Sequence, residues 1–448
     1  MSSWVTRPLF EKGRTALLRA AFEKSELLRG EVAVPGDKSI SHRAAIVGAV
    51  CRGGVTARGF SPADDCSSTC EVLRELGVRV DRAPGRVLVE GRGDTGLEQP
   101  VGALDAGNSG TTMRLLAGVL AARPMTVTLT GDDSLRKRPM TRIIEPLRMM
   151  GATITGDDAE GHPPLKIQGG ALDGIEYSQA VPSAQVKSAI LLAGLGASGR
   201  TVVREKIPTR DHTERLLERM GIEVVRRGLS VEVEPGVPSG CDLDIPGDLS
   251  SAAFVITLAL ICPKSDITVR SVGLNPTRTG FLDLVRRMGA DILVDVEDDG
   301  SWEPVGDIRI RHSSLEGIEL TGEDVAGAID EVTLVALLAT QAKGRTVIRG
   351  AAELRHKESD RIGGTVLGLS AMGADIRETE DGMVIEGGRA LTGADVSPDR
   401  DHRLAMMFAV AGMAAAGRTI VSDWECSDVS YPGFLEAVRG LGGRAFHD

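Results

Sequence analysis

An octapeptide pattern recurs six times in this chain and limits its fold more than any other feature. The copies read LRELGVRV, LRMMGATI, LERMGIEV, VRRMGADI, LSAMGADI and VRGLGGRA, beginning at Leu73, Leu147, Leu217, Val285, Leu369 and Val438. Each copy is typical of an amphipathic helix that ends at a left-handed glycine and is followed by a strand. The copies recur about every 70 residues, which exceeds the period of solenoid repeats. The pattern therefore predicts six small subdomains built from helices and strands.

A second repeat divides the six copies into two sets of three. VPGDKS at 34–39 and IPGDLS at 245–250 are nearly the same hexapeptide, and each precedes an apolar helix pattern. We expect two similar α/β domains, one of residues 37–246 and one of residues 1–36 together with 247–448. The chain would cross between them near 34–37 and 245–248 and form a hinge beside the active site. The sixth unit stops just after its strand, so we expect the strand near Glu31–Val34 to complete it.

Composition excludes several classes of function. The 448 residues include 52 Lys and Arg against 63 Asp and Glu, a net charge of −11, which argues against nucleic acid or an anionic membrane as partner. The longest uncharged run, Leu249–Pro263, is too short to span a bilayer. Six scattered cysteines without a CxxC pair indicate reduced thiols in a cytoplasmic protein, and no cluster predicts a metal site.

Two glycine-rich or polar helix starts in the first half could bind anions. In PGDKSISHR (35–43), Lys38 and Arg43 lie beside the free amides at a helix start. In DAGNSGTTMR (105–114), Gly107 and Gly110 would let backbone amides approach a ligand. Each segment also has a purely structural interpretation, because a capped helix start needs the same residue types.

Further charged segments extend this set into both halves. Arg138 precedes Pro139 and should be extended, while His402 and Arg403 open an apolar helix where two cations disfavour folding unless an anion is present. The cations at these places are Lys38, Arg43, Arg138, Arg210, Lys357, Arg361 and Arg403. They suit small, highly anionic ligands, with Asp330, Glu358 and His402 as candidate proton-transfer groups. Among cations, a carboxylate should stay ionised and a lysine should lose its proton more readily.

Known catalytic patterns are missing from the sequence. It has no Walker A loop, no Ser-His-Asp spacing, no HExxH and no convincing GxGxxG turn. Covalent catalysis, zinc and nicotinamide chemistry are therefore disfavoured, and we expect no cofactor.

Six motifs resemble, in order and spacing, the signatures of the 5-enolpyruvylshikimate-3-phosphate (EPSP) synthase family. They are PGDKSISHR, GNSGTTMR, LRKRPM, SAQVKSA, HKESDR and DHRLAM, and the resemblance runs from about Glu26 to Leu441. It implies an α/β fold of two inside-out domains, each of three βαβαββ-like units, that close on their substrates. It also implies transfer of the enolpyruvyl group of phosphoenolpyruvate to the 5-hydroxyl of shikimate 3-phosphate, with release of phosphate, in the pathway to chorismate and the aromatic amino acids.

The resemblance also implies residue roles. The shikimate 3-phosphate site would contain Lys38, Ser39, Arg43, Ser183, Ala184, Gln185, Arg210, Asp330 and Lys357. The phosphoenolpyruvate site would contain Lys38, Asn108, Gly110, Thr111, Arg138, Gln185, Arg361 and Arg403. Asp330, helped by Lys357, would take the hydroxyl proton, Glu358 would protonate the methylene carbon, and His402 would orient this network. Lys38 would share the acid and base duties, whose exact division stays open.

The chain departs from the family pattern at two places. Ala184 stands where some members have a second serine, and Val429–Ser430 stand where many have a lysine. Gly110 keeps the position that leaves room for the inhibitor glyphosate, so we expect inhibition. We expect a monomer, and we expect the first 25 residues to be a helical extension.

Two alternatives remain at this stage. The related UDP-N-acetylglucosamine enolpyruvyl transferases have a cysteine in the loop where this chain reads SLRKRP, and Lys-Asn where it reads Lys38-Ser39. A non-catalytic repeat protein that acts as a binding module would explain the repeats but would not need the proton-transfer groups.

Overall fold

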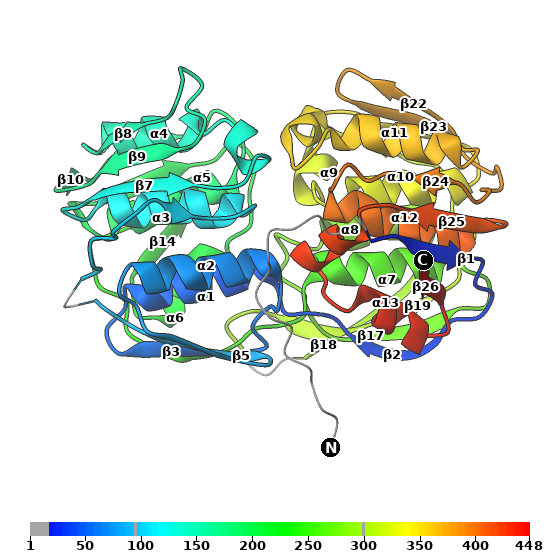
Figure 1. Cartoon of the computed structure of the whole chain (residues 1–448), viewed down its shortest axis with the longest axis horizontal. Coiled ribbons are helices and arrows are strands. Elements are labelled where there is room, and N and C mark those ends of the chain that lie inside the picture. The colour runs from blue at the N-terminus through cyan, green and yellow to red at the C-terminus, as the bar shows by residue number, and fades with distance from the viewer. Residues whose placement is uncertain (1–17, 94–95, 298–300) are drawn as a thin grey trace.

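The computed structural model describes residues 18–93, 96–297 and 301–448, which form two lobes side by side (Figure 1). Each lobe has its own hydrophobic core. The core of lobe one comes from residues 40–245. The core of lobe two comes from residues 20–28 and 249–445. The proposed domain boundaries, 37–246 against 1–36 with 247–448, fall between these two cores.

The described residues form six four-stranded sheets that share one topology, and three belong to each lobe. The first unit of lobe one contains β16 (Asp242–Asp244), α1 (Lys38–Ala49), β3 (Gly54–Arg58), α2 (Asp64–Glu75), β4 (Val80–Ala83) and β5 (Arg86–Glu90). The second unit contains β6 (Leu104–Asp105), α3 (Gly110–Ala121), β7 (Thr126–Thr130), the 3-10 helix η1 (Leu135–Lys137), α4 (Thr141–Met149), β8 (Thr153–Thr155) and β9 (Leu165–Gln168). The third unit contains β11 (Glu176–Ser178), α5 (Ala184–Gly194), β13 (Thr201–Arg204), α6 (His212–Arg219), β14 (Val224–Arg227) and β15 (Ser230–Val233). A short pair, β10 (Leu172–Asp173) and β12 (Ala197–Ser198), joins the second and third units.

Lobe two repeats this plan. The fourth unit contains β2 (Arg29–Ala33), α7 (Leu249–Ile261), β17 (Asp266–Gly273), α8 (Gly280–Arg287), β18 (Asp291–Glu297) and β19 (Val305–Arg311). The fifth unit contains β20 (Glu319–Leu320), α9 (Gly322–Gly327), α10 (Val332–Gln341), β21 (Arg345–Ile348), the 3-10 helix η2 (Ala352–His356), α11 (Arg361–Ala371), β22 (Asp375–Thr379) and β23 (Gly382–Glu386). The sixth unit contains β24 (Asp395–Val396), α12 (His402–Ala414), β25 (Arg418–Val421), the 3-10 helix η3 (Trp424–Val429), α13 (Phe434–Gly440), β26 (Arg444–His447) and β1 (Ala20–Glu23). In every unit the first two strands are parallel and the other pairings are antiparallel, which confirms the predicted mixed α/β fold.

The glycine of each octapeptide ends a helix as predicted. All six have a positive φ: Gly77 80°, Gly151 110°, Gly221 82°, Gly289 91°, Gly373 89° and Gly442 98°. A side chain is disfavoured in this region of backbone conformation, so these positions require glycine. The repeat in the sequence is therefore a repeat of helix ends.

The N-terminal segment corrects two expectations. The strand at Arg29–Ala33 pairs with β17 and completes the fourth unit, not the sixth. The sixth unit is completed by β1, which lies between β25 and β26, so Ala20–Glu23 is a strand and not part of a helical extension (Figure 1). The short apolar run fits either periodicity, and only tertiary pairing decides between them. The rest of the expected extension, residues 1–17, lies outside the described residues.

At each crossing between the lobes, a strand belongs to one lobe and the helix that follows it belongs to the other. Strand β2 belongs to lobe two but leads into α1 of lobe one, and β16 belongs to lobe one but leads into α7. The crossings are hydrogen-bonded to each other, because Asp37 N donates to Pro246 O and Asp248 N donates to Pro35 O, both at 2.8 Å. The two PGD segments thus run side by side between the lobes, at the positions predicted for a hinge.

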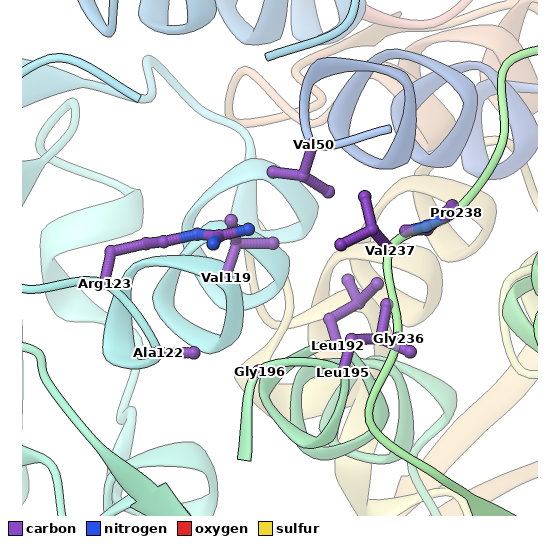
Figure 2. Close-up of a pocket in the computed structure, with 10 residues that line it drawn as sticks. All are labelled: Val50, Val119, Ala122, Arg123, Leu192, Leu195, Gly196, Gly236, Val237 and Pro238. Carbon is purple, nitrogen blue, oxygen red and sulfur yellow. The ribbon is translucent and has the colours of Figure 1, made fainter. Parts of the chain in front are cut away.

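Buried helices occupy the centre of each lobe and the sheets lie outside them. All 13 residues of α7 are buried, and α1, α3, α5, α10 and α12 are nearly as enclosed. The helices α1, α3 and α5 end around a cavity of about 40 Å³, lined by Val50, Val119, Ala122, Arg123, Leu192, Leu195, Gly196, Gly236, Val237 and Pro238 (Figure 2). No predicted site residue lines it. The predicted residues Lys38, Gly110 and Ala184 are the first residues of these helices, so the candidate site lies at their opposite, N-terminal ends. Within the described ranges, no helix is long and apolar enough to cross a bilayer.

Candidate active site

Polar side chains cap the buried helices on which the predicted residues lie. Asp37 Oδ1 accepts from Ile40 N at the start of α1, at 2.9 Å. Ser109, Ser183 and Asp401 do the same for α3, α5 and α12. Each cap satisfies one or two of the free amides, and the positive end of the helix dipole remains. Helix starts of the kind that attract anions thus occur in both lobes, as the sequence predicts.

Arg43 is the central cation of the site in lobe one. Its guanidinium donates to Thr213 Oγ1 at 2.7 Å, to Ser188 Oγ at 2.9 Å and to Ser39 O at 2.9 Å. All three acceptors are neutral oxygens, so these bonds orient the charge without neutralising it. Burial lowers the pKa of Arg43 to about 10. Its charge therefore remains available to an anionic ligand at neutral pH.

The start of α3 contacts the start of α5 through a side-chain relay. Arg114 donates to Gln185 Oε1 at 2.6 Å, and Gln185 Nε2 donates to Thr111 Oγ1 at 2.9 Å. Arg114 was not among the predicted site residues, although its position four residues after Gly110 places both on one helix face. A Cβ atom at Gly110 would lie 2.9 Å from Arg114 Nη1 and 3.3 Å from Arg138 Nη1. The absence of a side chain at Gly110 therefore lets two guanidinium groups pack closely against this helix start.

Arg138 connects the lobes. Its backbone is extended, with φ −89° and ψ 127°, as Pro139 predicts. The side chain donates to Asn108 Oδ1 at 3.0 Å, and its Nη1 lies 3.4 Å from Glu358 Oε1 of lobe two. Ser134 Oγ donates to the Glu358 carbonyl at 3.2 Å beside it. The second and fifth units thus meet at these polar residues.

In lobe two, Arg361 lies between two carboxylates. It is 1% exposed and donates to Asp401 Oδ2 at 2.7 Å and to Glu358 Oε2 at 2.5 Å. Asp401 also accepts from Arg403 N at 2.9 Å and so caps α12. Asp401 was not predicted as a site residue, although its place directly before His402 at a helix start is a capping signal.

His402 corrects the expectation of two cations at the start of α12. It is 3% exposed, and burial, with the nearby charge of Lys38, lowers its pKa well below the usual value. The imidazole is therefore neutral at physiological pH. Within the described residues its buried Nε2 has no hydrogen-bond partner. The helix start thus carries one cation, Arg403, together with the cap Asp401.

Asp330 and Glu358 are ionised, as expected. Asp330 Oδ2 accepts from Arg210 of lobe one at 2.6 Å, with Arg403 at 3.8 Å. Burial would raise the pKa of Asp330, but Arg403 and Arg210 outweigh it and hold the pKa well below the usual value. Burial likewise opposes ionisation of Glu358, and Arg361 and Arg138 hold its pKa well below the usual value. Both carboxylates are proton acceptors in this state.

The two lysines differ from each other. Burial would lower the pKa of Lys38, but Asp65, whose Oδ2 lies 2.7 Å from its Nζ, outweighs this and raises it. Burial lowers the pKa of Lys357, whose Nζ is 3.9 Å from Asp330 Oδ1. The expectation of easily deprotonated lysines is thus wrong for Lys38, because Asp65 was not recognised as its partner.

The chain is similar to known proteins over most of its length. The model of the family EPSP synthase (3-phosphoshikimate 1-carboxyvinyltransferase) matches residues 22–438. This chain belongs to the EPSP synthase family. It is 51% identical over 417 residues to the 3-phosphoshikimate 1-carboxyvinyltransferase of Desulforudis audaxviator, covering 92% of this chain and 97% of that protein. The Brevibacillus brevis protein of the same name is 48% identical over 93% of this chain and 98% of its own length.

A solved structure supports the fold assignment. EPSP synthase from Acinetobacter baumannii superposes with a TM-score of 0.85 at 41% identity, covering 97% of this chain and 100% of that one. In the present chain, contacts between the lobes pair Arg210 with Asp330 and Arg138 with Glu358. Ser39, Ser183 and Ala184 lie in the first turns of α1 and α5. In the described part of the chain, no three His, Cys, Asp or Glu residues are grouped to hold a metal ion.

Proposed function

We propose that this chain catalyses the reaction of its family, the transfer of the enolpyruvyl group of phosphoenolpyruvate to the 5-hydroxyl of shikimate 3-phosphate. The observation that supports this is a pair of carboxylates that contact cations of both lobes. Arg210 lies 2.6 Å from Asp330, and Arg138 lies 3.4 Å from Glu358. Each substrate carries a phosphate and a carboxylate, which such cations bind by charge-assisted hydrogen bonds. The product would serve the pathway to chorismate and the aromatic amino acids.

The lobes would divide the two substrates. Shikimate 3-phosphate would bind chiefly to lobe one, where Arg43 presents a charge oriented by neutral oxygens. Its partners would be Lys38, Ser39, Arg43, Ser183, Ala184, Gln185 and Arg210, with Asp330 and Lys357 from lobe two. Phosphoenolpyruvate would bind between the lobes to Lys38, Asn108, Gly110, Thr111, Arg138, Gln185, Arg361 and Arg403. Arg138 and Arg361 already lie close enough for one group to contact both, since each contacts the Glu358 carboxylate.

Asp330 would act as the base for the 5-hydroxyl. Its carboxylate is ionised but is weakened as a base by Arg210, which donates to it at 2.6 Å. When shikimate 3-phosphate occupies Arg210, this bond is shared with the ligand, and the basicity of Asp330 rises. Lys357 would guide the hydroxyl, since its Nζ is 3.9 Å from the same carboxylate. Binding of shikimate 3-phosphate would therefore make Asp330 a stronger base.

Glu358 would act as the acid for the methylene carbon. Because its pKa is held low by Arg361 and Arg138, it must first gain a proton. The anionic groups of phosphoenolpyruvate neutralise these arginines, which raises the pKa of Glu358 on binding. Protonation of C3 and attack of the 5-oxygen on C2 give a tetrahedral intermediate. Loss of phosphate from C2 and of a proton from C3 then gives the enolpyruvyl ether, while the cations stabilise the negative charge.

The test is phosphate release when both substrates are present. Glu358→Gln should reduce turnover at least about 100-fold, the usual scale for losing a general acid, and should leave the Kd for shikimate 3-phosphate unchanged. Glu378→Gln, an exposed carboxylate on β22, is the matched control and should keep full turnover. If the wild type binds both substrates but releases no phosphate, the proposed activity is wrong. An active Glu358→Gln enzyme would remove the acid role alone.

We also propose that glyphosate binds in place of phosphoenolpyruvate, and that the protein is a cytoplasmic monomer. The close approach of Arg114 and Arg138 to Gly110 supports the first part, since it gathers two guanidinium groups at the start of α3 where a small anion could bind. Inhibition should be competitive with phosphoenolpyruvate and should require shikimate 3-phosphate. Non-competitive inhibition would contradict this site. Sedimentation of the full chain, with and without ligands, tests the monomer.

A further inference from the structure

Four consecutive residues at the start of α6 connect the proposed shikimate 3-phosphate site to lobe two. Arg210 reaches Asp330 of lobe two, and Thr213 accepts from Arg43 of lobe one at 2.7 Å. The two residues between them, Asp211 and His212, also bond to lobe two. This segment therefore bonds to the central cation of one lobe and to the proposed base of the other.

The contacts of Asp211 and His212 form a buried junction. His212 Nδ1 lies 2.7 Å from Glu303 Oε1, and the two residues are 2% and 1% exposed. Asn275 Nδ2 donates both to Glu303 Oε2 at 2.8 Å and to Asp211 Oδ1 at 2.7 Å. Next to this group, Trp302 packs on the core of lobe one. Its Nε1 donates to the carbonyl of Asp244 at 3.3 Å. Asp244 directly precedes residues 245–248, where the chain crosses between the lobes for the second time.

Burial makes this junction different from the rim contacts between the lobes. The rim pair Arg142–Glu353 is 43% and 38% exposed at its side chains, so water can replace it at little cost. Parting His212 from Glu303 would leave buried polar groups without partners, which is costly. The junction also lies beside the hinge, where rotation moves the lobes least. We therefore expect it to persist when the two lobes move relative to each other.

We propose that Glu303 of lobe two is a positioning residue for shikimate 3-phosphate, acting through His212 on Arg210 and Thr213. The inference rests on the proposed function. Glu303 holds the His212 ring, which fixes the start of α6. Thr213 in turn orients Arg43, and Arg210 is held toward the ligand and Asp330. Substrate affinity in one lobe would thus depend on a carboxylate of the other lobe that does not contact the substrate.

The test measures shikimate 3-phosphate binding by calorimetry together with steady-state kinetics. Glu303→Ala should raise the Kd and KM for shikimate 3-phosphate about tenfold, the scale of coupling between contacting residues. The KM for phosphoenolpyruvate at saturating shikimate 3-phosphate should change little. Glu303→Gln keeps an acceptor for His212 and should recover most of the affinity. Glu297→Gln, exposed on β18 of the same hairpin, is the control and should match the wild type.

The outcomes separate this inference from the proposed function. If the wild type itself does not turn over, the proposed function fails. If the wild type turns over and a folded Glu303→Ala protein keeps the wild-type Kd, the positioning role is wrong, and any loss of thermal stability alone is structural. If Glu303→Ala does not fold, the double variant His212→Leu/Glu303→Leu replaces the buried pair by apolar groups, which buried pairs tolerate. A wild-type Kd in that folded variant overturns the proposal equally.

Discussion

Gly110 shows how one absent methyl group controls the anion-binding side chains. The position begins α3 and faces the ends of Arg114 and Arg138, which orient Gln185 and meet Glu358. Both guanidinium ends are flexible enough to move, but they would move away from the geometry that binds a small anion. The residue therefore acts on affinity more than on stability.

Gly110→Ala should raise the KM for phosphoenolpyruvate roughly tenfold, from the usual 1–3 kcal/mol cost of overpacking. The KM for shikimate 3-phosphate should stay within about twofold, because its proposed contact Arg43 is not displaced. Steady-state kinetics with each substrate varied in turn check this. Gly102→Ala, at an exposed glycine with open space around it, is the control. Equal rises in both KM values would contradict the argument.

Buried neutral histidines make the stability depend on pH. Burial, then Lys38 and Arg43, lower the pKa of His42 well below 6.5, whereas the unfolded state binds a proton near that pH. The unfolded state therefore holds more protons below pH 6.5, and stability falls as the pH drops through that value. The loss should reach about 1.4 kcal/mol per pH unit for each such histidine. His402 adds to it in the same direction.

Urea unfolding at pH 7.5 and pH 5.5 measures this dependence. His42→Gln should reduce the loss between the two pH values, although its Thr69 contact at 2.7 Å is disturbed at both. His447→Gln, at an exposed strand position, is the comparison variant. An identical loss in the wild type and in His42→Gln would show that His42 is not the titrating group.

At the scale of the element, the buried helices of lobe one pack backbone to backbone. A Cβ atom at Gly118 in α3 would lie 2.1 Å from the carbonyl oxygen of Ala189 in α5. Glycine here has a packing role, because these two helices share the centre of the lobe. The octapeptide glycines have a different role, since a positive φ ends each helix there.

Gly118→Ala should lower the free energy of unfolding by about 2 kcal/mol, because helix α3 must move away from α5. Gly440→Ala in α13 has nothing within 4 Å of the added carbon and should gain up to about 1 kcal/mol from helix propensity. Urea unfolding of the two variants compares them directly. A gain for both would mean that the helices can separate without cost.

At the scale of the whole molecule, polar contacts dominate where the lobes face each other across the site. Arg210–Asp330, Arg138–Glu358 and Arg142–Glu353 are ion pairs that join the two lobes. Interfaces of this polar kind allow domains to move. Ligands that carry two anionic groups can bind cations of both lobes at once, and so favour the closed arrangement.

Small-angle scattering should therefore show a smaller radius of gyration with shikimate 3-phosphate plus glyphosate than without ligands. Sodium chloride at equal ionic strength controls for screening of surface charge. Shikimate 3-phosphate alone should compact the protein less, since the proposed phosphoenolpyruvate site is then empty. No compaction with both ligands would contradict closure.

Local patterns in the sequence determined much of this protein. The six octapeptides predicted the helix ends, because only glycine adopts the required φ at low cost. The cations at helix starts predicted an anion site, because free amides and basic side chains attract the same ligands. The motifs indicated the family that comparison then showed.

Tertiary structure alone decided which distant segments are partners. β1 joins β25 and β26, and β2 joins β17, because the crossings exchange strands between units, and strand patterns do not encode their neighbours. Asp65 pairs with Lys38, and Asp401 pairs with Arg361, and each pair joins two different elements. These carboxylates stabilise the charged form of their partners. Glu303 reaches His212 across 91 residues of sequence. Charge states and contacts of this kind depend on distance in space, which a repeat pattern along the chain does not contain.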